Sequence, residues 1–147
     1  NLPDRASQVA MMAQMQNIFD FPPSPKTDEY NRIIPEKATE MEIQGDKLFW
    51  GKAECSDCHS GPALTDDRMH DLHLERFYEA EVITGQYNIA DGPIKTFTLR
   101  GIKDSPPYHH DGRLMTLEDT VEFFSLILEL DLTQDEKQAL VAYLRCL

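Results

Sequence analysis

Apolar residues recur at helical spacing in four stretches of the chain. The first stretch, residues 4–19, contains few helix breakers, and Val9, Met12 and Met15 fall on one side of the expected helix. Its methionines are typical of side chains that fill gaps in a packed surface, so we expect this helix to contact a neighbour. Residues 21–35 then hold four prolines among turn-forming residues, and this composition predicts an extended connector.

Three capping boxes mark where the other helices begin, because a threonine is followed three positions later by an acidic residue. They start at Thr39, Thr116 and Thr133. The first predicted helix runs toward Gly51, and the second should bury one side. Its buried positions would be Leu117, Val121, Phe124 and Leu128, whereas the last helix would bury Leu140 and Leu144 and pack Tyr143 across Gly45 and Phe49.

The segments between these helices show weaker patterns. Residues 60–92 are rich in loop-forming residues, with a short helix expected around residues 67–74. Residues 94–99 alternate only weakly, so we expect extended chain rather than a sheet. The sequence therefore predicts a mainly α-helical protein with long loops, divided into a helix and connector over residues 1–37 and a second unit over residues 38–147.

Composition narrows the classes of function. The net charge of −12 argues against nucleic acid as a partner, since binding phosphates needs a basic surface. No apolar run is long enough to span a membrane, so we expect a soluble protein. The chain begins at Asn1 rather than Met, and we expect that a signal peptide or a longer upstream part has been removed.

The strongest chemical signal is the run Cys55-Ser56-Asp57-Cys58-His59, which has the C-x-x-C-H spacing of covalent c-type haem attachment. Each thiol can add to a haem vinyl group, while the histidine reaches the iron. Two alternatives remain open. A zinc site needs four ligands that Cys146 and scattered histidines would have to complete, and a dithiol redox site would be expected after a strand.

Three separated motifs resemble a known family. Gly45-x-x-x-Phe49, the haem motif and the last helix are similar to the crossed helices of class I cytochromes c. The runs over residues 51–62, 95–100 and 107–113, the last reading Pro-Tyr-His-His-Asp-Gly-Arg, resemble more closely the C-terminal haem domain of bacterial di-haem cytochrome c peroxidases and MauG.

This resemblance implies a domain that accepts single electrons from a small cytochrome or cupredoxin and passes them to a second haem domain that reduces peroxide. The sequence holds one C-x-x-C-H motif, so the chain is either part of a di-haem protein or a stand-alone electron carrier. The alternative is an enzyme that reduces hydrogen peroxide at an open iron, and a third reading is a haem domain that only docks on a partner. Covalent haem attachment implies a periplasmic location.

The resemblance also assigns roles around the haem. Cys55 and Cys58 would attach it, His59 would be the proximal ligand, and Arg100 and His110 would contact its propionates. Relatives carry the sixth ligand, Met or Tyr, at a position that matches Phe124 here, and phenylalanine cannot bind iron. Met69 is our first candidate for that ligand, with His70, His73, Met115 or an open site as alternatives. Carbonyls at Ser105 and Pro107 match a calcium site between domains, but this sequence lacks the ligand from the other domain, so we do not expect bound calcium.

Overall fold

The computed structural model describes residues 5–19, 24–74, 81–88 and 92–147. In these ranges four α-helices dominate, namely α1 (Arg5–Gln16), α2 (Glu40–Phe49), α3 (Leu117–Ile127) and α4 (Gln134–Leu144). Two short antiparallel pairs join β1 (Met69–His70) to β4 (Ile94–Lys95) and β2 (Glu81–Ile83) to β3 (Gln86–Asn88). Single 3₁₀ turns occur at Pro35–Lys37, Cys55–Asp57 and Ile102–Asp104. The prediction of a mainly helical fold is confirmed.

All three predicted capping boxes form. At the start of α2 the Glu42 amide donates to Thr39 Oγ1 (3.3 Å) and the Thr39 amide donates to the Glu42 carboxylate (2.7 Å). Thr116 and Thr133 make the same reciprocal bonds at the starts of α3 and α4. Each box satisfies amides that the helix itself leaves without partners, which is why the sequence places these three helix starts well.

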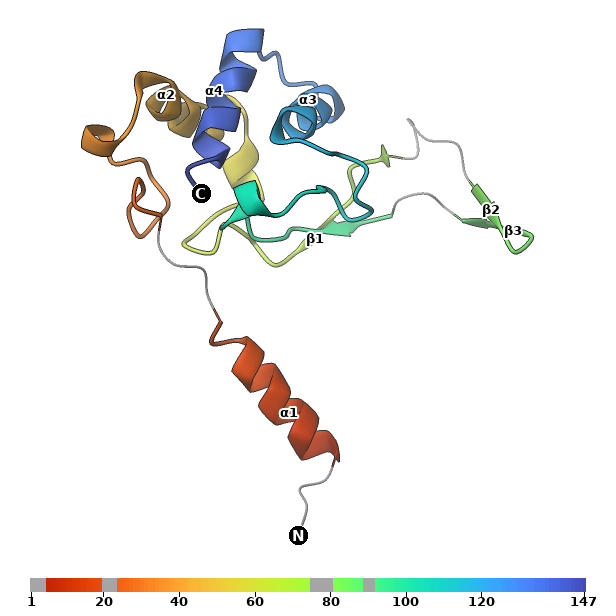
Figure 1. Ribbon diagram of the computed structural model, residues 1–147. Coiled ribbons are helices and arrows are strands. Elements are labelled where there is room, and N and C mark those ends of the chain that lie inside the picture. The colour runs from red at the N-terminus through yellow and green to blue at the C-terminus, as the bar shows by residue number, and fades with distance from the viewer. Residues whose placement is uncertain (1–4, 20–23, 75–80, 89–91) are drawn as a thin grey trace.

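Helices α2 and α4 cross in close contact, as the sequence predicts (Figure 1). A Cβ built on Gly45 would lie 2.0 Å from the Ala139 carbonyl oxygen and 2.7 Å from Tyr143 Cβ. The Phe49 and Tyr143 rings lie 5.1 Å apart, and both residues are buried. The missing side chain of Gly45 therefore lets the two backbones touch, and the aromatic rings fill the space one turn later.

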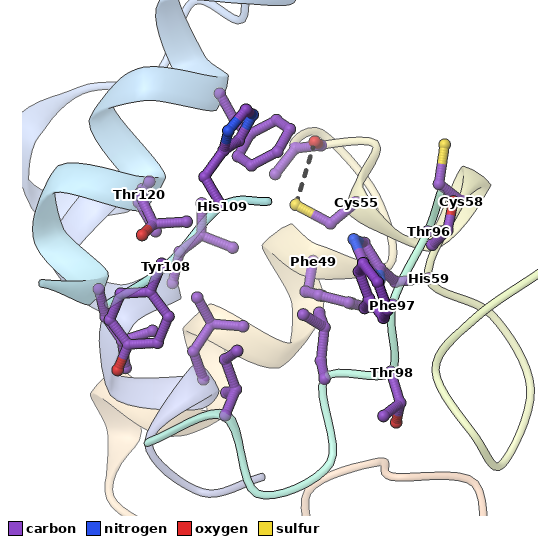
Figure 2. A pocket seen from close by; sticks show the side chains of 18 of the residues that line it. Phe49, Cys55, Cys58, His59, Thr96, Phe97, Thr98, Tyr108, His109 and Thr120 are labelled. Atoms are coloured by element: carbon purple, nitrogen blue, oxygen red, sulfur yellow. Dashed lines mark hydrogen bonds between the residues drawn. The ribbon is translucent and has the colours of Figure 1, made fainter. Parts of the chain in front are cut away.

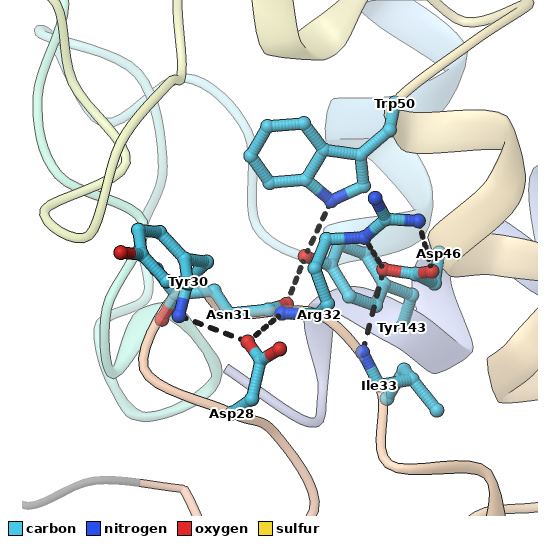
Figure 3. Close-up of polar contacts among 8 residues, drawn as sticks. All are labelled: Asp28, Tyr30, Asn31, Arg32, Ile33, Asp46, Trp50 and Tyr143. Atoms are coloured by element: carbon cyan, nitrogen blue, oxygen red, sulfur yellow. Dashed lines mark hydrogen bonds and ion pairs between the residues drawn. The ribbon is translucent and has the colours of Figure 1, made fainter.

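The second half of the proline-rich connector packs on this crossing (Figure 3). The Tyr143 hydroxyl donates to the Asn31 carbonyl (2.7 Å) and accepts from Trp50 Nε1 (3.3 Å). The Arg32 guanidinium donates to both carboxylate oxygens of Asp46, at 2.9 and 2.8 Å. These bonds tie residues 28–33 to α2 and α4, so this part of the connector belongs to the packed unit.

Two sequence predictions about local structure are wrong. Residues 67–74 do not form the expected helix, because Asp67 and His73 adopt positive φ and β1 pairs with the distant β4. Leu128 is 43% exposed instead of buried, because α3 ends one residue earlier and Ile127 takes the inward position. Both outcomes depend on contacts that local periodicity does not encode.

Helix α1 has no buried residue in the described part of the chain. Figure 1 shows it away from the other helices, and its apolar side chains Val9, Met11, Met12 and Met15 are all more than half exposed. The predicted neighbour of this helix stays a prediction. Among the described residues, none of the helices combines the length and the apolar character needed to cross a membrane.

Candidate functional site

A cavity of about 530 Å³ lies between the helices and the loop that precedes α3 (Figure 2). Its apolar lining comes from three helices, with Phe49 on α2, Val121 and Phe124 on α3, and Leu140 on α4. A cavity of this size and character is typical of a cofactor site. Few polar groups of these three helices face this space.

The haem motif lies on the wall of this cavity. Cys55, Cys58 and His59 all line it, and Figure 2 labels them among the side chains around the pocket. The 3₁₀ turn Cys55–Asp57 comes a few residues after the end of α2 at Phe49, and the His59 amide donates to the Cys55 carbonyl (2.9 Å). This tight turn brings two thiols and an imidazole to the same side of the cavity.

The orientation of His59 suits a metal ligand. Its Nδ1 lies 3.1 Å from the Leu64 carbonyl oxygen, and a carbonyl can only accept, so Nδ1 carries the proton and Nε2 keeps its lone pair. Burial lowers the pKa of His59, although the carbonyls of Leu64 and Phe97 oppose part of that effect. The side chain is thus a neutral imidazole whose free nitrogen can bind iron.

The two motif thiols are poorly suited to dithiol redox chemistry. Burial raises the pKa of Cys55 to about 12 and also raises the pKa of Cys58. A reactive dithiol needs a lowered thiol pKa, so the dithiol interpretation is disfavoured.

The structure also gives little support to a closed zinc site. Cys146 is buried in the last turn, where its thiol donates to the Ala142 carbonyl (3.3 Å), and it does not line the cavity. Cys58, Asp66 and His70 place their potential ligand atoms within 4.8 Å of one another. Cys55 is absent from that group. The two motif cysteines therefore do not share a set of four zinc ligands in the described part of the chain.

Arg100 and His110, the predicted propionate contacts, line the same cavity. Arg100 is half-buried and follows a loop in which Thr65 Oγ1 donates to the Thr96 carbonyl (2.7 Å) and Thr98 Oγ1 donates to the Ala63 carbonyl (2.6 Å). His110 is exposed at the rim. Phe124 also lines the cavity, so the position at which the resemblance led us to expect a sixth ligand faces this space. Arg100, His110 and Phe124 therefore line the same cavity as the haem motif.

The structure does not bring our first candidate for the sixth ligand to the cavity. Met69 lies on β1, is 58% exposed and lines a separate hollow beside Ile94 and Phe97. Met115 is 65% exposed and the His73 side chain 68% exposed, and neither lines the cavity. His70 does line it, but its Nε2 lies 2.7 Å from Asp66 Oδ2.

His109 is a cavity residue to which the sequence analysis assigned no role. Its side chain is 4% exposed and lines the cavity, and its ring meets that of Phe123 edge-on at 5.2 Å. No spacing in the sequence points to it, because its neighbours Tyr108 and His110 are equally plausible from composition. Only the fold of the loop decides which of the two histidines is buried with an unpaired nitrogen.

Comparison with known proteins relates this chain to cytochrome c peroxidases and MauG. A scan against models of protein families finds no match. Cytochrome c551 peroxidase from Nitrosomonas europaea is 33% identical over 134 residues, covering 85% of this chain and 39% of that protein. Methylamine utilization protein MauG from Methylorubrum extorquens is 32% identical over 123 residues, covering 71% of this chain and 33% of that protein.

Among solved structures, a MauG-like protein associated with microbial copper homeostasis has a TM-score of 0.62 at 26% identity, covering 75% of this chain and 44% of that one. This likeness extends the sequence match to the arrangement of the helices. The chain spans about two-fifths of the length of the curated relatives it matches. These findings make the chain a homologue of the di-haem cytochrome c peroxidases and MauG, which are c-type haem proteins.

Proposed function

We propose that this chain carries single electrons through one haem attached covalently to Cys55 and Cys58, with His59 as the proximal ligand. The observation that supports this most strongly is the position of all three side chains on one wall of a 530 Å³ apolar cavity. The Leu64 carbonyl holds Nδ1 of His59 and leaves Nε2 for the iron. The haem would supply the one-electron chemistry itself.

The chain's own residues would orient the haem and exclude water. Phe49, Leu140 and Leu144 form a packed wall of the cavity, and such a wall restricts rearrangement when the charge of the site changes by one. The Arg100 guanidinium would pair a propionate, since its fork of donors matches a carboxylate. Enclosure by packed helices would keep the structure similar in both oxidation states, and this would favour rapid electron transfer.

The partner would be a second haem domain, a small cytochrome or a cupredoxin. The relatives are longer than this chain, and their family contains a second haem domain. A net charge of −12 would attract a basic redox protein and raise the rate of encounter at low salt. Covalent haem attachment would place the protein in the periplasm.

A second candidate function is the reduction of hydrogen peroxide, which the names of the relatives favour. Phe124 has no atom that could occupy the sixth position, so an open site is chemically possible. Peroxide cleavage would also need an acid or base close to the iron. His109 could be such a group only if its buried imidazole does not itself bind the iron.

The experiment that separates these functions mixes the reduced holoprotein either with an oxidised basic cytochrome or with hydrogen peroxide and follows the haem absorption. An electron carrier should be oxidised rapidly by the cytochrome, with a rate that falls as salt rises, and only slowly by peroxide. Repeated turnover with peroxide by this chain alone would contradict the proposal. A Cys55→Ser, Cys58→Ser double variant, which cannot attach haem, gives the baseline for both reactions.

A further inference from the structure

The loop before α3 buries the side chain of one of its two histidines, because His109 is 4% exposed in its side chain whereas His110 lies exposed at the rim. Tyr108 and Leu114 bridge the loop by backbone bonds of 2.6 and 3.3 Å, and the Gly112 amide donates to the His109 carbonyl (3.2 Å). His109 has a φ of 72°, which a non-glycine residue adopts only when its surroundings hold it there. Figure 2 shows the His109 side chain on the opposite side of the pocket from His59.

A carboxylate fixes which nitrogen of His109 carries the proton. Nδ1 of His109 lies 3.2 Å from Asp111 Oδ1 and 2.8 Å from Nδ1 of His110. An ionised carboxylate only accepts hydrogen bonds, so Nδ1 of His109 donates to Asp111 and Nε2 of His109 keeps its lone pair.

Asp111 is itself held in place by Arg113. The Arg113 amide donates to Asp111 Oδ1 (3.2 Å), and Nε of its guanidinium donates to Asp111 Oδ2. Arg113 and Asp111 thus support His109 from behind. A carboxylate that orients a histidine through one nitrogen while the other faces a metal is a recurrent arrangement at metal sites.

The other nitrogen of His109 has no hydrogen-bond partner in the described part of the chain. His109 Nε2 is buried, and its ring is held edge-on against Phe123 at the cavity wall. Leaving a buried polar atom unsatisfied costs about 1–3 kcal/mol. A lone pair in this position needs either a proton donor or a metal ion, and the cavity that His109 lines is the one we assign to haem.

We infer that His109, through Nε2, is the sixth ligand of the haem iron, which would make the site a bis-histidine centre. This inference rests on the proposed function, since it requires haem in the cavity. Met69, Met115 and His73 are exposed and do not line the cavity. The Nε2 atom of His70 is already taken by its contact with Asp66 Oδ2 (2.7 Å).

Two histidine ligands would have a defined consequence. The iron would be six-coordinate and low-spin, and its potential would be lower than with a methionine ligand. Exogenous ligands such as carbon monoxide would have to displace His109. The site would thus favour electron transfer and disfavour direct reaction with peroxide.

The test compares the absorption and electron paramagnetic resonance spectra of the purified ferric holoprotein with those of His109→Ala. The wild type should be low-spin and lack the weak long-wavelength band of a methionine-ligated haem. His109→Ala should become high-spin and bind carbon monoxide when reduced, and added imidazole should restore the low-spin spectrum. His73→Ala and Met69→Ala, which change exposed residues, are matched controls and should keep the wild-type spectrum.

Three results would overturn this inference: a high-spin wild type, a methionine-type band in the wild type, or a low-spin spectrum unchanged in His109→Ala. The wild-type spectra can refute the inference even if His109→Ala does not fold. A pyridine haemochrome assay on each sample keeps the two proposals apart. If covalent haem is present but His109→Ala has the wild-type spectrum, only the assignment of His109 as ligand is refuted. If covalent haem is absent, the proposed function is refuted.

Discussion

Removing the hydroxyl of Tyr143 should destabilise the protein without disturbing its shape. Tyr143 is 0% exposed, and its hydroxyl joins two parts of the chain through the Asn31 carbonyl (2.7 Å) and Trp50 Nε1 (3.3 Å). In Tyr143→Phe the ring still packs on Phe49, so the apolar contacts survive. Only the two polar contacts of the buried hydroxyl are lost.

The two partners contribute unequally to the expected loss. Asn31 is 8% exposed, so its carbonyl would remain buried without this donor, at a cost of about 1–3 kcal/mol. Trp50 is only half-buried and its bond is long, so water can replace much of it. We expect a total loss of roughly 1.5–3 kcal/mol in the free energy of unfolding, and a fall in Tm of roughly 3–12 °C for a domain of this size.

Urea denaturation of the holoprotein, with an unchanged slope against urea concentration, measures this loss. Tyr30→Phe is the matched control, because Tyr30 is 58% exposed in the same connector, and its free energy of unfolding should change by less than about 0.5 kcal/mol. If Tyr143→Phe changes stability no more than Tyr30→Phe does, the hydroxyl does not hold the connector on the helices and the argument is wrong.

Two further predictions concern the packing of α2 and its salt bridge. Gly45→Ala should lower the free energy of unfolding by about 1–3 kcal/mol despite the better helix propensity of alanine, because the new Cβ would lie 2.0 Å from the Ala139 carbonyl oxygen. Thermal unfolding should show no such loss for Met41→Ala, which is half exposed on the same helix; equal Tm values for the two variants would contradict the close crossing. Burial opposes ionisation of Glu42, but Lys26 and Thr39 lower the pKa of its carboxyl from 4.5 to about 2. The unfolded chain therefore binds this proton first as pH falls. The stability that Glu42 adds is complete above about pH 5 and lost toward pH 2, so urea titrations should find wild type and Glu42→Gln converging in acid, and a constant difference would refute this.

Sequence alone predicts the parts of this protein that depend on local chemistry. The capping boxes locate α2, α3 and α4 because each is completed within four residues. The haem motif is equally local, since its two thiols and imidazole lie within five consecutive residues. The crossing at Gly45 follows from one absent side chain opposite Tyr143.

The rest depends on contacts between distant segments. Met69 looked like a ligand because it is apolar in a polar loop, but pairing of β1 with β4 leaves it exposed. His109 and His110 cannot be told apart by residue type, and only the positive φ of His109 and its contact with Phe123 distinguish the inward side chain. Local patterns therefore identify the attachment site, whereas the opposite wall of the cavity requires the fold.

The most direct test of covalent haem binding is the mass of the protein purified from cells that can attach c-type haem. The account predicts the mass of the polypeptide plus one haem, retained after denaturation in acid, and the loss of that increment when Cys55 and Cys58 are both replaced by serine. A polypeptide of unmodified mass, or haem released by acid, would contradict it.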